Sequence, residues 1–551
     1  MNPLTFTKYA RRLFLALAAV SGLFLSAGCG SSSSAPINPQ GFSDSSLSGT
    51  YVFSFSGTDV TNDNVSFFAA VGVLSADGKG NFASGTVDIN DPALAAALNS
   101  TTNVFPAESA TGTYNVTADG RGTGKITVTI NGTGVPIGLD FVLTSGGGLN
   151  PVSSHGLITR FDGNGTGSGT IDLQTSGITQ SSLQGSYAFG FSGIDTGGNP
   201  FGTVGAFNLD AFGNATGLQD FDDNGVSPGE PAGLSLSGNV TVGSPVTTAA
   251  LNTSSGDFTF DVYIVDNTHL KFIETDELAI LAGDAFTQQT SIPAGVYAYT
   301  MEGQDSSDNP MAMGGFFTSD GTSAISAGLE DYNDAGTVNE VTGITGSYSP
   351  FTGGRTELNL SGFFNGSSLG NSILFAAYPS SGGIQLLEID NARSGAVTGG
   401  IALAQGTTTT IATSQGYGLN LTAINGGSGA GMFEEDDIAQ FIVNTNNTFK
   451  GVEDINDEGT LTGGASFTGT LTPDTTVPGH GSVTNSSEFN FNYYVANNGS
   501  TVLILETDSN QLGVGSFQLQ NADVEPVGGL SRLMIARSKA GARPAAKTFK
   551  K

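Results

Sequence analysis

One acidic sequence element occurs four times along the chain, and this repetition restricts the fold more than any other feature. Near-copies of GTVDIND (85–91) stand at GLQDFDDN (217–224), GLEDYND (328–334) and GVEDIND (451–457). The glutamines that close the units are separated by 115, 116 and 115 residues, and they are Gln174, Gln289, Gln405 and Gln520. A period this regular predicts four tandem domains of one kind.

Each unit opens with a strictly alternating segment. In the first unit Tyr51, Phe53 and Phe55 alternate with small or polar residues, and later units open the same way at Tyr187, Tyr297 and Tyr417. A period of two predicts a strand with one core side and one wet side. The wet-side positions are Ser54, Gly190, Thr300 and Asn420.

Asp-Gly turns between alternating segments, as in VGVLSADGKGNF (71–82), predict consecutive hairpins. Each unit then contains about seven or eight antiparallel strands with turns at short, regular intervals. The sequence therefore predicts an all-β protein of four tandem β-barrel-like domains, whose many Phe and Tyr residues fill the barrel interiors. Two-layer β-sandwiches are the alternative, and the sequential hairpins favour barrels.

The expected boundaries follow from these markers. Four β domains span 47–177, 182–290, 293–406 and 411–521. A signal peptide (1–29) and a Ser/Pro-rich tether (30–46) precede them, and a basic C-terminal tail (522–551) follows. Because the linkers between units are short, neighbouring barrels are expected to stand close together in a stiff row.

The N-terminus has the features of an export signal, with Lys8, Arg11 and Arg12 before the apolar run 13–25. The following LSAGC (25–29) resembles the lipobox of bacterial lipoproteins, although Ser26 stands where a branched apolar residue is usual. The resemblance implies that Cys29 is lipidated and anchors the chain to a membrane. Gly30 favours the outer membrane, with the body facing the periplasm or the cell surface. An ordinary cleaved signal is the alternative.

The charge of the chain excludes one class of partner. All 49 Asp and Glu residues lie between positions 30 and 531, where there are only eight Lys or Arg, so this region carries −41. Such a charge repels phosphate backbones, and nucleic-acid binding is not expected. A single Cys also excludes internal disulfides and any Cys-built zinc site.

The repeated acidic turns are the candidate metal sites. Asp454, Asn456 and Glu458 occupy alternate positions, as at the start of a calcium loop, and Asp331 and Asn333 repeat part of that pattern. The twelfth position, where calcium loops place a bidentate Glu, is Ala465, so no EF-hand is expected. The EEDD run (434–437) and FDDNG (221–225) add further oxygen ligands. Calcium at one or more of these loops is one hypothesis, and ordinary Asp and Asn turn chemistry is the other.

No catalytic constellation is evident. The three histidines, His155, His269 and His480, fall at apparently different places in the repeat and are expected in turns or at the surface. Glu274, Glu388 and Glu506 each stand two residues before an Asp, which could suit glycoside hydrolysis. Because the pair occurs in three units, a structural role is the preferred interpretation, and no catalytic residues are assigned.

Two resemblances extend these expectations. The Gly-x-Tyr openings weakly resemble the Gly-x-Trp openings of calycin-like (lipocalin-like and avidin-like) barrels. The whole pattern resembles uncharacterised Gly-rich β-repeat bacterial lipoproteins, and that resemblance implies no activity. We therefore predict a lipid-anchored, monomeric, non-catalytic cell-envelope protein with a structural or binding role in adhesion or surface presentation. Its expected partner is an unidentified protein or glycan, and calcium is the only cofactor considered. The alternatives are a carrier of small apolar ligands and a secreted hydrolase.

Overall fold

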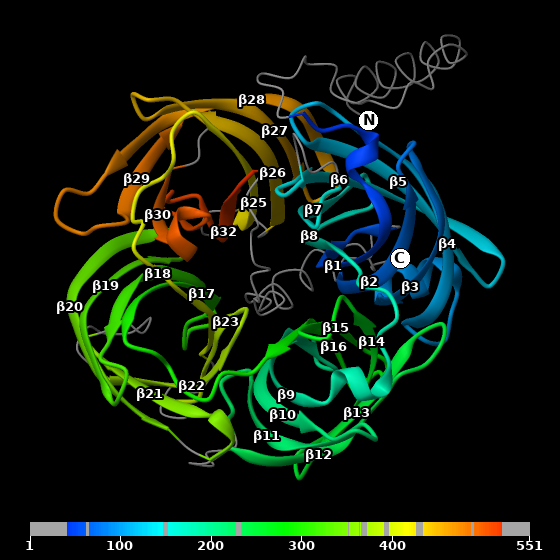
Figure 1. Ribbon diagram of the computed structural model, residues 1–551, viewed down its shortest axis with the longest axis horizontal. Helices are drawn as coiled ribbons and strands as arrows, with labels where there is room; N and C mark the ends of the chain where they lie inside the picture. The colour runs from blue at the N-terminus through cyan, green and yellow to red at the C-terminus, as the bar shows by residue number, and fades with distance from the viewer. Residues whose placement is uncertain are drawn as a thin grey trace, which may run out of the picture. The chain divides into compact units, whose positions relative to one another are not determined.

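The structure, a computed structural model, describes residues 41–61, 66–146, 152–227, 233–350, 352–362, 364, 372–390, 396–425, 433–485 and 490–520. All of them belong to one compact unit, residues 36–551. They form four closed antiparallel barrels of eight strands each (Figure 1). The prediction of four tandem β-barrels is confirmed, and the sandwich alternative is not. Cys29 and the basic tail lie outside the described residues.

Barrels 1 and 2 are formed by β1 to β16. The strands of barrel 1 are β1 (Ser48–Asp59), β2 (Ser66–Asp77), β3 (Asn81–Asn90), β4 (Val104–Val116), β5 (Arg121–Ile130), β6 (Thr133–Leu143), β7 (His155–Asp162) and β8 (Gly165–Leu173). Those of barrel 2 are β9 (Gly185–Asp195), β10 (Pro200–Leu209), β11 (Asn214–Asp223), β12 (Leu234–Thr241), β13 (Thr247–Thr253), β14 (Gly256–Ile264), β15 (His269–Glu274) and β16 (Ala279–Thr287).

Barrels 3 and 4 are formed by β17 to β32. Barrel 3 contains β17 (Gly295–Gln304), β18 (Pro310–Ser319), β19 (Ala324–Asp334), β20 (Thr337–Pro350), β21 (Thr356–Ser361), β22 (Ser372–Ser380), β23 (Gly383–Glu388) and β24 (Val397–Ala404). Barrel 4 contains β25 (Gln415–Asn425), β26 (Phe433–Val443), β27 (Thr448–Asp457), β28 (Thr460–Pro473), β29 (His480–Asn485), β30 (Asn490–Ala496), β31 (Thr501–Glu506) and β32 (Gln511–Leu519). The described helical elements are short: η1 (Asp44–Ser46), α2 (Pro92–Leu98), η3 (Gln180–Leu183), η4 (Thr352–Gly354) and η5 (Asn497–Gly499).

Each barrel is an up-and-down meander whose eighth strand pairs with its first. A glycine in the eighth strand permits this closure. A Cβ on Gly169 would lie 1.7 Å from the backbone oxygen of Ser54 on β1, so only glycine allows the two strands to approach this closely. Gly283, Gly400 and Gly515 hold the same position against Gly190, Thr300 and Asn420.

Aromatic and aliphatic side chains fill the barrel interiors. The core-side residues of the first strands, such as Phe53, Phe189, Tyr299 and Tyr417, are buried in four separate apolar clusters, one in each barrel. In barrel 2 the rings of Phe189 and Phe191 stack with centroids 4.6 Å apart. Burial of these rings supplies most of the apolar stabilisation of each unit.

Four further contacts join the barrels, and we call them seams 1–2, 2–3, 3–4 and 4–1. Each of the first three seams is filled by apolar side chains of mixed size, from Ala to Leu, Ile and Phe, together with one tyrosine, which is Tyr263, Tyr378 or Tyr494. Seam 4–1 is formed by Val142, Leu157 and Ile438. The expectation of a row is therefore wrong, because barrel 4 packs against barrel 1 and the contacts close into a cycle.

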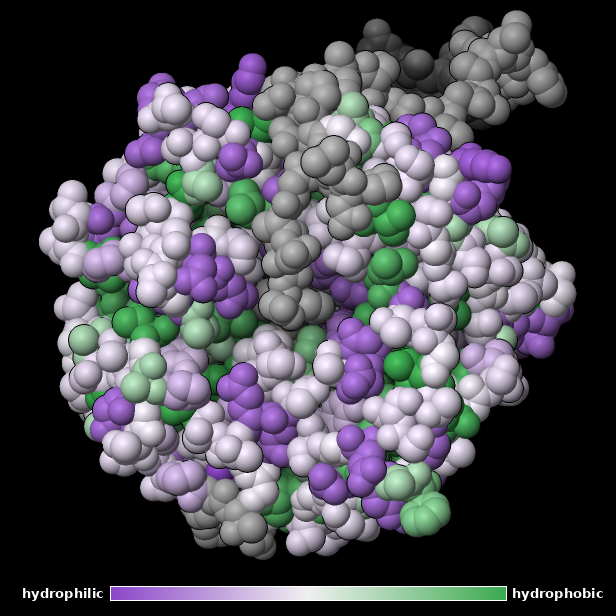
Figure 2. Space-filling model, in the orientation of Figure 1, coloured by the Kyte–Doolittle hydropathy of each residue, from purple (hydrophilic) through white to green (hydrophobic). Residues whose placement is uncertain are grey.

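Residues of intermediate hydropathy cover most of the face drawn in Figure 2, and strongly hydrophilic and hydrophobic residues occur there in small, separated patches. The largest exposed apolar side chain is Phe212, 86% exposed in the turn between β10 and β11. Among the described residues, no helix has the length and apolar character needed to cross a membrane. Residues 41–46, from the segment expected to be a tether, lie against barrel 1, where Phe42 is buried.

Candidate functional site

The repeated acidic element lies at the seams. In each copy the first Asp and the residue two places later face the next barrel, whereas the residues between them face the core of their own barrel. The seam-facing Asp residues are Asp88, Asp220, Asp331 and Asp454, all at most 7% exposed. The sequence thus marked the contact between domains.

In three seams a basic group accompanies this Asp. Arg355, directly before β21, donates from Nε and Nη2 to the Asp220 carboxylate at 2.7 and 2.9 Å, and the Tyr378 hydroxyl donates to Asp220 at 2.6 Å. In seam 3–4 His480 begins β29 and pairs with Asp331 (Nε2–Oδ2 3.0 Å), while the Tyr494 hydroxyl donates to Asp331 at 2.6 Å. Arg355 and His480 therefore occupy the same place, at the start of a fifth strand.

The other two seams complete the comparison. In seam 4–1 the fifth strand begins with Arg121, which pairs with Asp119 at 3.1 Å. Burial raises the pKa of Asp454, and the Gly464 N–H and the charge of Arg121 oppose this only in part. In seam 1–2 the fifth strand begins with Thr247 instead. There burial, reinforced by the charge of Asp261, raises the pKa of Asp88 to about 8.

The second seam-facing residue of the element is usually Asn, and its amide crosses the seam. Asn456 Nδ2 donates to the carbonyl oxygens of Arg160 and Gly165, both at 2.8 Å. Asn333 Nδ2 donates to three carbonyls of barrel 4 at 3.0–3.1 Å. Asn90 reaches the Glu274 carboxylate of barrel 2 at 3.0 Å. These amides hold adjacent barrels in register.

The closing glutamines make a second set of contacts across the seams. Each donates its side-chain amide to a backbone carbonyl of the next barrel, at 2.7–3.0 Å. The pairs are Gln174 with Ile264, Gln405 with Pro478, and Gln520 with Asp119, and in the second unit the neighbouring Gln288, not Gln289, holds this place and donates to Gly353. The Gln520 pair joins barrel 4 to barrel 1, so both repeated sequence markers lie at the seams.

The structure separates the residues considered for calcium. Asp331 and Asn333 lie in seam 3–4, whereas Asp454 and Asn456 lie in seam 4–1. Glu458 lies in the turn after β27 with a positive φ of 45°. The amide oxygens of both Asn residues accept turn N–H groups, from Gly336 and Gly459. This geometry is that of turn chemistry, and calcium at these loops stays a prediction.

Among the described residues, one set of three acidic or histidine ligands has all its ligand atoms within 4.8 Å of one another: Asp331, Glu340 and His480. Both ring nitrogens of His480 are already engaged, because Nδ1 lies 3.1 Å from Asp474. Burial alone would lower the pKa of His480, but the bonds to Asp331 and Asp474 outweigh burial and raise it. A protonated His480, at the position that Arg355 holds in seam 2–3, supplies the positive charge that Asp331 needs, so this set requires no metal ion.

The expectation for the histidines is wrong. All three are at most 6% exposed and pair with Asp, and His155 and His269 hold one place, the start of the seventh strand. These two histidines are 114 residues apart, close to the repeat period, so the sequence already carried this equivalence. Because acidic residues are abundant in this chain, each buried histidine lies beside a carboxylate that can accept its N–H.

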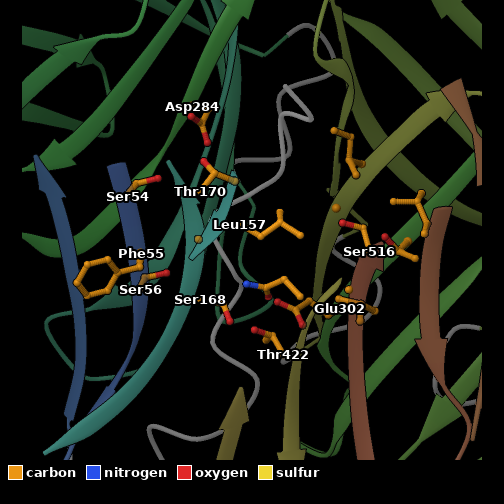
Figure 3. A pocket seen from close by; sticks show the side chains of 18 of the residues that line it. Ser54, Phe55, Ser56, Leu157, Ser168, Thr170, Asp284, Glu302, Thr422 and Ser516 are labelled. Atoms are coloured by element: carbon orange, nitrogen blue, oxygen red, sulfur yellow. The ribbon is translucent and has the colours of Figure 1, made fainter. Parts of the chain in front are cut away.

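The wet sides of the first and last strands line a partly open cavity of about 240 Å³ that touches all four barrels. Hydroxyl groups of Ser54, Ser168, Thr170, Thr422 and Ser516 surround it (Figure 3). The wet-side residues Thr300 and Asn420 also line it. In the first strands, the large apolar side chains therefore point into the barrel core, and the small or polar side chains between them point toward the shared cavity.

A buried charge network borders the cavity between barrels 1 and 2. Lys271 Nζ lies 3.2 Å from Asp172 and 3.1 Å from Asp284, and each Asp also holds a histidine, His155 at 2.6 Å and His269 at 2.7 Å. Burial would raise the pKa of Asp172, but Lys271 and His155 more than offset it and lower the pKa. Each buried carboxylate in this network therefore has a lysine and a histidine as partners.

No protein-family model and no curated protein sequence matches the chain. Three solved structures show a distant likeness. Intact Ap-TbpB (N and C lobes) has 10% identity and a TM-score of 0.17, with 67% of this chain and 84% of that chain covered. A single mutant of the vaccine antigen transferrin binding protein B from Haemophilus parasuis Hp5 has 8% identity and a TM-score of 0.17, with 67% and 83% covered. The P pilus usher (PapC) translocation pore has 8% identity and a TM-score of 0.13, with 86% and 100% covered. Scores this low carry no inference about function.

Proposed function

We propose that this protein is a lipid-anchored, non-catalytic binding protein of the cell envelope, which holds a small polar ligand in the cavity shared by its four barrels. The observation that carries the proposal is the cavity itself, lined by side chains from every unit. The barrel interiors are packed with aromatic side chains, whereas this cavity presents hydroxyl and amide groups from all four barrels.

The lining defines the chemical class of ligand. Most of its polar side chains are hydroxyls or amides. Its two carboxylates are Asp284, which is paired with His269 and Lys271, and Glu302. The volume is below the ~300–1,000 Å³ of pockets that enclose drug-sized ligands. An uncharged, polyhydroxylated molecule such as a sugar, or the end group of a glycan, fits both the chemistry and the size.

Cavity-filling substitutions test the ligand assignment. We expect calorimetric titration against a panel of mono- and disaccharides to give binding to the wild-type chain and none to Ser54→Phe or Ser516→Phe. Thr129→Phe, at an exposed position on β5, serves as the matched control and should bind like the wild type. Absence of binding by the wild type across the panel, or full binding by both Phe variants, would refute the assignment.

The lipobox-like LSAGC segment supports the anchor. Two or more acyl chains on one residue are enough for stable membrane attachment. We expect the wild-type chain to incorporate radiolabelled palmitate and to fractionate with outer membranes, and Cys29→Ser to do neither. A Cys29→Ser protein that still fractionates with membranes would exclude lipidation as the anchor.

One observation favours the carrier alternative for a single barrel. The mouth of barrel 2 contains a hollow of about 150 Å³ lined by Phe201, Phe221 and Phe258. A fluorescent apolar probe should then bind the wild type with one site and lose affinity in Phe258→Ser. Unchanged probe binding in that variant would exclude barrel 2 as a carrier site.

A further inference from the structure

The inward-facing residues at one end of each barrel differ among the four units in a way that points to a ligand. The sheet registers identify four equivalent positions, two on the second strand and one each on the third and seventh strands. We call this end of a barrel its acidic-element mouth, because the repeated acidic element ends there. Barrel 1 has Phe68, Ala70, Val87 and Arg160; barrel 2 has Phe201, Thr203, Gln219 and Glu274; barrel 3 has Met311, Met313, Glu330 and Glu388; barrel 4 has Glu435, Asp437, Glu453 and Glu506.

In the first three mouths each charged side chain has a hydrogen-bond or ion-pair partner, although burial raises the pKa of Glu274 to about 9. In barrel 1 the Arg160 guanidinium lies 2.7 Å from Asp59 and 3.2 Å from Asp162, and it stacks over the Phe68 ring at 5.0 Å. In barrel 2 Glu274 accepts from Asn90 at 3.0 Å and from the Asp276 N–H at 2.8 Å. In barrel 3 Glu330 accepts from the Phe364 N–H, and Glu388 accepts from the Thr398 hydroxyl.

Barrel 4 concentrates four carboxylates and leaves most of their oxygens without a hydrogen-bond partner. Both oxygens of Asp437, both of Glu506 and one of Glu453 are buried and unpartnered. These three side chains are at most 1% exposed. Glu435, 7% exposed, accepts from Gln511 Nε2 at 2.7 Å. Burying ionised carboxylates without partners is strongly unfavourable, so the mouth requires protons or a cation.

The electrostatic environment points in the same direction. Burial raises the pKa of Asp437, and the charges of Glu453, Glu435, Glu506 and Asp436 raise it further. Burial and the charge of Glu435 also raise the pKa of Glu453, to about 8. Where barrel 1 places Arg160, barrel 4 places Glu506. The position that supplies a positive charge in one unit therefore supplies a negative charge in the other.

We propose that the acidic-element mouth of barrel 4 binds one hydrated divalent cation, Ca²⁺ or Mg²⁺, through Asp437, Glu453 and Glu506. Hard cations take carboxylate oxygens as ligands, and they fill at this mouth the place of the Arg160 charge in barrel 1. No three of these carboxylates bring their oxygens within 4.8 Å of one another, since Asp331, Glu340 and His480 are the one such set in the described part of the chain. The ion therefore keeps part of its water shell. This site lies inside a barrel and is independent of the cavity proposed to bind a polar ligand.

The test is a titration of the full chain, freed of ions by EDTA and gel filtration, with CaCl₂ and separately with MgCl₂. Isothermal calorimetry should report one site, and the ion should raise the unfolding temperature measured by circular dichroism. The double variant Asp437→Asn/Glu453→Gln should lose at least tenfold in affinity. Because that variant removes unneutralised charge, it should unfold at a higher temperature than the wild type in EDTA, which also shows that it folds.

Glu340→Gln is the matched control, because it removes a ligand from the seam 3–4 set and leaves the mouth intact. It should bind the ion like the wild type. The proposal is overturned if millimolar Ca²⁺ and Mg²⁺ give the wild type neither heat nor a thermal shift, which would assign protons to the mouth. It is also overturned if the double variant retains the affinity, or if Glu340→Gln abolishes binding.

Discussion

Replacing Arg355 with Met tests whether the ion pairs hold the barrels together. Arg355 is fully buried and contributes two N–H donors to Asp220, at 2.7 and 2.9 Å, while Tyr378 supplies a third donor to the same carboxylate. The substitution removes two charge-assisted hydrogen bonds and leaves a buried carboxylate with one partner. Removing one member of a buried pair costs about 3–5 kcal/mol, and Met preserves most of the apolar stem.

Guanidinium unfolding followed by far-ultraviolet circular dichroism measures this loss, and amide hydrogen exchange in β22 and β23 locates it.

Two further variants make the reasoning refutable. Asp220→Asn/Arg355→Met should recover more than half of the loss, because a neutral amide still accepts from Tyr378 and carries no charge to bury. Lys79→Met, at an exposed lysine, should change the free energy of unfolding by no more than about 0.5 kcal/mol. A loss below about 1 kcal/mol for Arg355→Met, or no recovery in the double variant, would show that seam 2–3 does not depend on this pair.

Three other predictions concern the remaining seams and barrel closure. The pKa of His480 is raised in the folded state, so its contribution is complete below about pH 6.5 and is lost as pH rises through the folded value; thermal unfolding from pH 5 to 9 should show this loss in the wild type and not in His480→Gln. Asn456→Ala removes two 2.8 Å bonds across seam 4–1 and should cost about 1–3 kcal/mol by chemical denaturation, whereas the exposed Asn446→Ala should cost almost nothing. Gly169→Ala places a Cβ 1.7 Å from a backbone oxygen and should prevent soluble expression, while Gly124→Ala, with neighbours no closer than 3.5 Å, should express normally.

The EEDD run at 434–437 contains four consecutive acidic residues whose side chains point alternately to the two sides of one strand. Alternation along β26 sends Glu435 and Asp437 into barrel 4, and it sends Glu434 and Asp436 into seam 4–1. There Asp436 accepts from the Thr166 and Ser168 hydroxyls of barrel 1, both at 2.7 Å. The sequence showed one acidic cluster, whereas the strand divides it between two environments with different chemistry.

The repeat period, the alternation in the opening strands and the Asp-Gly turns were sufficient to predict four antiparallel barrels, because these signals act over a few residues and recur in each unit. The number of barrels follows from the repeat period, and their filled interiors follow from the alternation of aromatic and small residues along each strand. The repeated glutamines and acidic elements could also be recognised in the sequence, but their role in contacts between barrels could not.

Only the tertiary structure decided that these markers cross from one barrel to the next, and that Gln520 and Asn456 return to barrel 1. A contact between residues several hundred positions apart leaves no periodic signal in a single sequence. The same limit concealed the shared cavity and the pairing of His480 with Asp331 across seam 3–4, because each depends on how whole barrels pack, and not on the order of residues within one strand.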